Sequence, residues 1–145
     1  MFKKILVPTD GSALALSAAT TAVQLAKNQG GQVIGVYVID PFPYIGLGDA
    51  SAAGLQAYMA ESRNVAGQAL DALGKVCAAE GVPFTGDTIE RNVVYEGVIE
   101  TAQVEGCDLI VMASHGRQGV KALVLGSVAQ KVLTHTQLPV MIVKG

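Results

Sequence analysis

The sequence has no tryptophan, few aromatic residues (5%) and few charged residues (15%), whereas half of its 145 residues are hydrophobic. So little charge beside so much apolar content is not typical of a disordered chain. The length suffices for one domain with a real core, because a domain of about 150 residues buries about two-thirds of its unfolded surface. We therefore expect a globular protein in which residues 1–145 form a single domain.

An excess of charge of one sign is also missing. The formal net charge is -2, and lysine and arginine are dispersed without a run. Nucleic-acid binding needs a basic face against the phosphate backbone, so we expect no nucleic-acid partner. The N-terminal apolar stretch is too short for the core of a signal peptide, and no uninterrupted apolar run reaches membrane-spanning length. We expect a cytoplasmic protein without a membrane partner.

Several common site motifs are absent. The two cysteines, Cys77 and Cys107, have no CxxC spacing and no histidine cluster, so we expect buried thiols rather than a disulfide framework or a zinc site. The stretch from Gly46 to Ser51 lacks the last glycine of the dinucleotide pattern, and the chain has no Gly-Lys-Ser/Thr P-loop and no Gly-x-Ser-x-Gly elbow. These absences disfavour NAD, Walker-type and serine-hydrolase sites.

Short apolar runs alternate with stretches of helical periodicity along the whole chain. Strands are predicted at 4–7, 33–39, 84–89, 109–112 and 140–143, and helices at 12–30, from about 51 to 81, at 95–105, and from 126–127 to before Pro139. Apolar strands joined by helices predict a parallel sheet covered on both faces. The predicted fold class is α/β, with one doubly wound five-stranded parallel sheet.

Two strand ends carry unusual residues, and ligands of such sheets bind outside the carboxyl ends of the strands. The first end is Pro8-Thr9-Asp10-Gly11-Ser12, and the second is Met112-Ala113-Ser114-His115-Gly116, followed by nine residues and Gly126-Ser127. Glycines leave backbone N–H groups open, and a helix that starts at Ser127 adds its positive end, so this loop is predicted to bind a phosphate chain. Arg117 and Lys121 could neutralise phosphate charge, and Mg²⁺ is a plausible companion.

The segments 4–12, 36–40 and 114–127 together resemble universal stress proteins, and the likeness spans essentially the whole chain. ATP-binding members of that family carry Gly-x2-Gly-x9-Gly-Ser/Thr, whereas this chain has Ala113 in place of the first glycine. The resemblance implies a Rossmann-like, adenine-nucleotide alpha-hydrolase-like fold with bound ATP, ADP, AMP or cyclic AMP. It implies phosphate contacts at Gly116, Gly126, Ser127 and Val128, a ribose contact at Ala113, ribose or adenine contacts at Asp10 and Val38, and a cleft lined by Pro8, Thr9 and Met112. His115 and Arg117 complete the candidate binding set.

Four residues have a plainer alternative role. Asp10 could simply make a turn with Gly11. The Ala113 methyl is tolerable if the backbone there has negative φ and disruptive if φ is positive. Arg91 stands where family members usually show a Gly-x-Pro-type turn, and it either shapes nucleotide selectivity or is a solvated loop residue. His115 has no accompanying nucleophile and orienting carboxylate, so we expect no catalytic role for it and at most slow ATP hydrolysis.

The favoured function is an ATP- or adenine-nucleotide-binding universal stress protein that acts as a stress-response sensor or regulator. The alternative is a nucleotide-independent dimeric interaction protein, since some members of the family lack the glycine loop. A homodimer through the C-terminal strand Val140 to Val143 is predicted in both cases, because that strand would otherwise be an exposed apolar edge.

Overall fold

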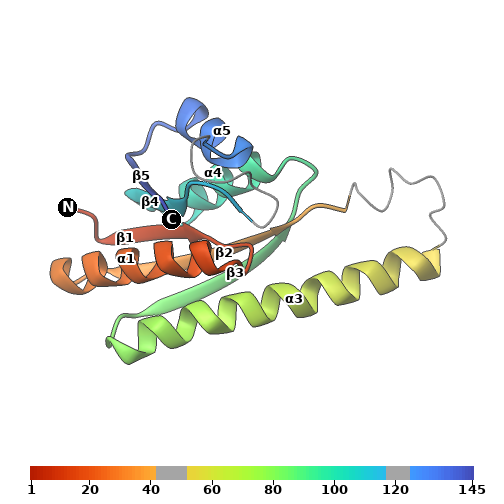
Figure 1. The fold of residues 1–145 in the computed structure, drawn as a ribbon, viewed down its shortest axis with the longest axis horizontal. Coiled ribbons are helices and arrows are strands. Elements are labelled where there is room, and N and C mark those ends of the chain that lie inside the picture. The colour runs from red at the N-terminus through yellow and green to blue at the C-terminus, as the bar shows by residue number, and fades with distance from the viewer. Residues whose placement is uncertain (42–51, 117–124) are drawn as a thin grey trace.

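The computed structural model describes residues 1–41, 52–116 and 125–145. Along the chain the elements are β1 (Lys4–Pro8), α1 (Ala13–Gln29), β2 (Gln32–Ile39), α3 (Ala52–Ala79), β3 (Phe84–Glu90), α4 (Val94–Val104), β4 (Leu109–Ala113), α5 (Ser127–His135) and β5 (Val140–Val143) (Figure 1). Each of these helices and strands was predicted, and the strand boundaries differ by one residue at most. Within the described residues, no helix combines the length and the apolar character needed to cross a membrane.

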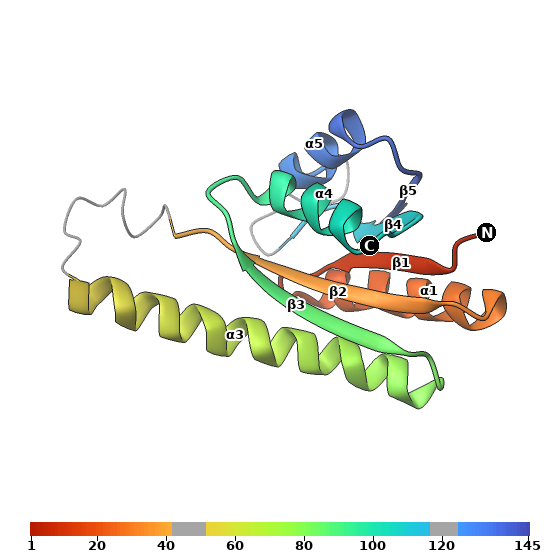
Figure 2. The ribbon, with the colours of Figure 1, turned by 180° about the vertical axis from the view of Figure 1, so that it is seen from behind.

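The strands form one parallel sheet in the order β3-β2-β1-β4-β5. Helices α1 and α3 cover one face and α4 and α5 cover the other, as Figures 1 and 2 show from opposite sides. The predicted doubly wound α/β fold is therefore confirmed.

The core consists of two apolar layers, because successive side chains of a strand point to opposite faces of the sheet. In β1, Ile5 and Val7 pack with α1 and α3, whereas Leu6 packs with Val98 of α4 and Val132 of α5. The buried face of α1 is mostly alanine, which lets this helix lie close to the sheet. The continuous apolar runs of the sequence are thus buried on both sides.

The ends of α1 follow the local sequence. The Ser12 hydroxyl accepts a hydrogen bond from the Ala15 amide (3.2 Å), which caps the first turn. Gly30 ends the helix in the left-handed region, with φ of 66°, where glycine has no steric penalty. The cap fixes where the β1–α1 turn stops and the helix begins.

Strand β1 lies at the centre of the sheet, between β2 and β4. The chain runs outward from β1 through β2 to β3 and then returns to β4 on the other side of β1. The connections that leave β1 and β4 therefore diverge at their carboxyl ends, which is where open α/β sheets bind ligands.

Both cysteines are buried thiols, as predicted: Cys77 on α3 and Cys107 just before β4. Burial is the main cause that raises the pKa of each thiol to about 11, because a thiolate is poorly solvated in the core.

Since the thiolate is the reactive form, both cysteines should react far more slowly than free cysteine with an aromatic disulfide reagent at pH 8. The released chromophore measures the rate, and the same protein in denaturant, where two thiols should react at once, is the control. Immediate reaction of either thiol in the native protein would contradict this prediction.

Candidate functional site

A cleft of about 570 Å³ opens where β1, β2 and β4 end. This volume lies in the range of small-molecule binding sites. The cleft brings together every described residue of the predicted binding set: Pro8, Thr9, Asp10, Val38, Met112, Ala113, His115, Gly116, Gly126, Ser127 and Val128. Arg117, the remaining member of the set, lies outside the described residues.

The loop after β1 forms a compact turn. The Thr9 amide continues the sheet by donating to the Val36 carbonyl (2.9 Å), and the Gly11 amide donates to the Thr9 hydroxyl (3.1 Å). Gly11 has φ of 82°, a conformation that favours glycine. Asp10 Oδ1 accepts from the Ser12 amide (2.9 Å), so Asp10 does make the turn that its pairing with Gly11 suggested.

The second carboxylate oxygen of Asp10 lies against the loop after β4. A Cβ atom added at Gly116 would collide with Asp10 Oδ2. Gly116 is not among the described glycines with positive φ, so a larger residue here would displace the Asp10 carboxylate without straining the backbone. Asp10 therefore contacts both loops: Oδ1 bonds to the Ser12 amide in the loop after β1, and Oδ2 lies against Gly116 in the loop after β4.

The start of α5 supplies backbone donors to the cleft. Gly126 is the N-cap and has no side-chain cap, and the first helical bond runs from the Gln130 amide to the Gly126 carbonyl (2.9 Å). The amides of Ser127, Val128 and Ala129 therefore precede the helical hydrogen bonds. These N–H groups and the positive end of the helix dipole favour an anion.

The Gly126 amide is bonded within the protein, whereas the sequence predicted that it would be open toward the cleft. Its amide already donates to the Ser114 carbonyl (2.6 Å), so it joins β4 to α5 instead of offering a donor to the cleft. A Cβ atom at Gly126 would lie 2.9 Å from Ser114 O and 3.0 Å from His115 Cα. Glycine is needed here because two backbone segments meet.

Ala113 is compatible with the cleft. Among the described residues, Phe2 is the only non-glycine residue with positive φ, so the condition under which a methyl group at 113 would be disruptive does not arise. The Ala113 side chain packs with Val111 in the core layer beneath α1, whereas Met112 belongs to the layer beneath α4 and α5. The methyl group therefore points away from the α4–α5 side of the sheet.

Much of the apolar wall of the cleft was not predicted from the sequence. It consists of Val36 and Tyr37 from β2, Val94 and Val98 from α4, Leu125, Ala129 from α5, and Ala15 from α1. The spacing of Val94 and Val98, four residues apart on one helix face, was a usable signal. It could not be distinguished from ordinary core packing until the position of α4 over β2 was known.

The described lining of the cleft contains one carboxylate, Asp10, and neither lysine nor arginine. His115 borders the cleft, and its Nδ1 lies 3.2 Å from the Ser114 hydroxyl. Within the described residues no group of three or more histidine, cysteine or acidic side chains is arranged to hold a metal ion. The described site therefore combines backbone donors, one carboxylate and apolar walls.

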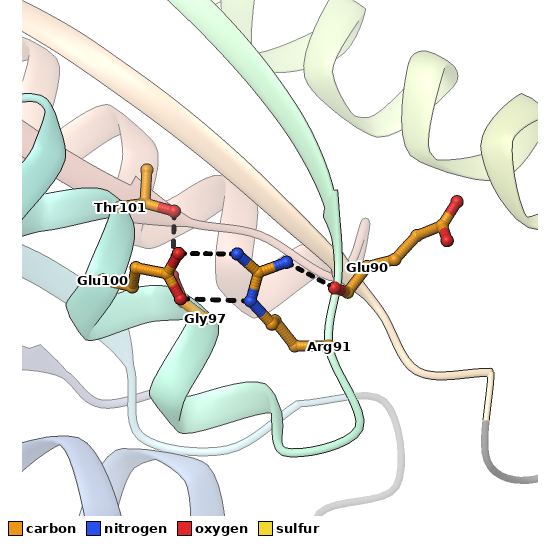
Figure 3. A network of polar contacts seen from close by, with 5 residues as sticks. All are labelled: Glu90, Arg91, Gly97, Glu100 and Thr101. Carbon is orange, nitrogen blue, oxygen red and sulfur yellow. Dashed lines mark hydrogen bonds and ion pairs between the residues drawn. The ribbon is translucent and has the colours of Figure 1, made fainter.

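Arg91 does not border the cleft. Its Nε and Nη2 atoms donate to the two carboxylate oxygens of Glu100 (3.0 and 2.6 Å), and Nη1 donates to the Glu90 carbonyl (2.6 Å) (Figure 3). The hydrogen bond from Arg91 lowers the pKa of Glu100, and the same contact raises the pKa of Arg91. Arg91 is thus an exposed loop residue, as one of the two alternatives expected, and it is held by an ion pair outside the described lining of the cleft.

Replacing Gly126 by alanine should lower the free energy of unfolding by about 1–3 kcal/mol, because the added methyl group meets backbone atoms that cannot move independently. Gly67→Ala is the matched control, since a Cβ there has no neighbour within 4 Å and removing a helical glycine should stabilise the protein by about 0.5–1 kcal/mol. Urea denaturation measures both. Equal effects of the two substitutions would show that the contact is not close.

Comparison with known proteins gives a consistent result. The model of the universal stress protein family matches residues 1–144. A universal stress protein of Methanocaldococcus jannaschii is 36% identical over 145 residues, with 99% of this chain and 83% of that protein covered. The solved structure of a second protein of that organism, MJ0577, has a TM-score of 0.87 at 27% identity and covers 100% of this chain and 97% of its own.

Two further solved structures are complexes with a nucleotide. One is a universal stress protein in complex with cAMP, with a TM-score of 0.69, 22% identity and coverage of 99% of this chain and 97% of that one. The other is the universal stress protein from Archaeoglobus fulgidus in complex with dAMP, with a TM-score of 0.67, 20% identity and coverage of 98% of both chains. At these identities the two structures show a shared fold.

Proposed function

Because the chain belongs to the universal stress protein family, we propose that it binds an adenine nucleotide in the cleft at the ends of β1 and β4 and acts as a stress-response sensor or regulator. The observation that carries the proposal is the placement of the first amides of α5, which precede its helical hydrogen bonds, in a cleft whose described lining is largely apolar. A nucleotide fits this arrangement, because its anionic phosphates can bind the amides and its flat, largely apolar base can pack against the apolar walls.

The phosphates are assigned to the α5 end of the cleft. The amides of Ser127 and Val128 and the Ser127 hydroxyl are the donors, and Gly116 borders the same part of the cleft. Gly126 holds these donors in place through its bond to Ser114. We extend the phosphate contacts to Arg117, which follows Gly116 directly in the sequence.

The base and ribose are assigned to the other end of the cleft. Val38 and the α4 residues Val94 and Val98 form an apolar slot for the base, and Pro8 and Met112 continue it toward the ribose. Asp10 can accept a hydrogen bond from a ribose hydroxyl while Oδ1 keeps its bond to the Ser12 amide. The backbone at Ala113 lies beside the ribose, and the methyl group does not obstruct it.

The nucleotide complexes of the related folds support the class of ligand. Those two proteins bind cAMP and dAMP, which share the adenine base and a single phosphate. We propose ATP, ADP, AMP and cyclic AMP as the candidates for this chain. Any hydrolysis of ATP should be slow, because Asp10 is the one carboxylate in the described lining, which leaves few groups there to position a metal ion and a water molecule.

Mg²⁺ would enter this cleft only together with the phosphates. The described residues hold no ready cluster of metal ligands, and a single carboxylate, Asp10, faces the loop in which the phosphates are placed. Mg²⁺ is commonly held by one or two carboxylates plus substrate phosphates, so this donor set fits a nucleotide-borne ion. The ion would offset the repulsion between Asp10 and the phosphate chain.

The nucleotide-independent alternative has no structural observation in its favour. Its support was the replacement of the first motif glycine by Ala113, and the backbone there accepts the methyl group.

Purified protein stripped of ligands should release or take up heat when titrated with an adenine nucleotide, with and without Mg²⁺. Ser127→Ala should weaken ATP binding about tenfold, because it removes one hydrogen bond to a charged phosphate. Ala113→Gly is the control, and it should change the affinity by less than about twofold, because the methyl group packs beneath α1. No heat with ATP, ADP, AMP, cyclic AMP or dAMP at high protein concentration would overturn the proposal.

We also propose that the protein is a homodimer through β5 (Val140–Val143). The sheet has two edges, and the β3 edge bears the charged residues Asp87 and Glu90, which discourage edge pairing. The β5 edge is wholly apolar, and Met141 on it is 37% exposed. Antiparallel pairing of two β5 strands would give a two-fold interface.

Sedimentation at micromolar concentration should report a dimer, and Met141→Lys should shift it to a monomer, because a charge on the edge opposes strand pairing. Val104→Lys places the same charge on an apolar residue that is more exposed, at the end of α4, and should leave the dimer intact. A monomeric parent protein, or equal effects of the two substitutions, would count against the β5 interface.

A further inference from the structure

The α4 wall of the cleft is held by an unusual set of contacts. Val94 and Val98 line the cleft, and the chain reaches α4 from β3 through residues 91–93 alone. The N-cap of α4 is Val93, which makes no side-chain capping bond. The first turn of α4 therefore needs another anchor.

Arg91, at the end of β3, ties α4 to the sheet. Its amide donates to the Ile39 carbonyl (3.0 Å), which fixes its backbone to the end of β2. Its guanidinium group binds the Glu90 carbonyl and, in a two-pronged contact, the carboxylate of Glu100 on the second turn of α4 (Figure 3). A planar two-bond contact defines orientation as well as distance.

Gly97 sets how closely α4 approaches the cleft. A Cβ atom at Gly97 would lie 3.1 Å from the methyl carbons of Val38 and from Ile89 Cδ1, so the helix backbone rests directly on these side chains. The buried Thr101 hydroxyl donates to the Gly97 carbonyl (2.8 Å). Gly97 is thus a close contact point of α4 on the sheet, and Arg91 binds the helix on the side facing the β3–α4 connection.

We infer that Arg91, through Glu100, is a positioning residue for the base-binding half of the cleft: it fixes Val94 and Val98 relative to Val38 and thereby sets the width of the apolar slot. The assignment of that slot to the base rests on the proposed function. The positioning of α4 is a property of the chain with or without a nucleotide. The ion pair thus restricts the position of α4 relative to β3, as a rigid turn between them would.

The chain contains a matched control for this contact. Arg63 on α3 forms an ion pair with Glu90 (2.6 Å), close in length to the shorter Arg91–Glu100 contact and similarly exposed. It joins β3 to the helix on the opposite face of the sheet, away from the cleft. Arg63→Met therefore removes an exposed ion pair of the same strand, with one hydrogen bond in place of two, without touching α4.

Arg91→Met should weaken ATP binding about two- to fivefold, the range expected for an exposed ion pair. It should also lower the ratio of ATP to GTP affinity, because a looser slot discriminates less between bases, and leave inorganic tripolyphosphate binding unchanged. Arg63→Met should alter none of these values. Adding Glu100→Gln to Arg91→Met should cause no further loss, since the two residues act through one contact. Calorimetry measures all of them.

Amide hydrogen exchange of the nucleotide-free protein tests the positioning directly. Arg91→Met should speed exchange at residues 97–101 while the amides of β1 and β4 keep their protection, and Arg63→Met should not. Unchanged exchange at 97–101, or an unchanged ATP to GTP ratio in a protein that binds ATP, would overturn the inference. If the parent protein binds no nucleotide, the proposed function fails, and the exchange data alone still decide whether Arg91 positions α4.

Discussion

The contact on which the site depends is the approach of two loops across the centre of the sheet, where Asp10 lies against Gly116. Strands β1 and β4 are neighbours only because the order β3-β2-β1-β4-β5 reverses at β1. The Asp10 carboxylate lies against the second loop at Gly116, where a side chain would displace it. Gly126 allows the next close contact, between the end of β4 and the start of α5. The end of the cleft next to α5 thus follows from sheet topology together with two glycines.

Most of the fold could be predicted from the sequence because its signals were local. The apolar run from Leu109, the cap at Ser12 and the left-handed glycine at Gly30 each determine their element with little help from distant residues. The two loops that follow β1 and β4 could be singled out by the same logic, whereas the contacts assigned to Val38 and Val128 came from the resemblance to universal stress proteins. Whether Ala113 was tolerable could not be predicted, because it depended on backbone φ and on the face toward which one strand residue points.

The apolar half of the cleft lay beyond prediction for a different reason. Val94 and Val98 have the spacing of any core-facing helix pair, and only the packing of Gly97 onto Val38 places them beside a cavity. The role of Gly126 was likewise hidden, because a glycine in a phosphate loop is expected to offer its amide, whereas here that amide is bonded to Ser114. In both cases the deciding contact joins residues from different elements, and periodicity along one element carries no information about it.

An exposed ion pair contributes little to the free energy of unfolding. The pair between Arg91 and Glu100 can therefore orient α4 without making a large contribution to stability. Because Arg91 lowers the pKa of Glu100, the pair contributes fully above the ordinary glutamate pKa of 4.5 and is lost as the pH falls through the lowered value. Across neutral pH the charges persist. Gly97 packs closely on Val38, which holds α4 against the sheet. The contact between Arg91 and Glu100 then fixes the orientation of the helix. Dense packing therefore bears the stability of α4, while a contact in solvent sets its alignment.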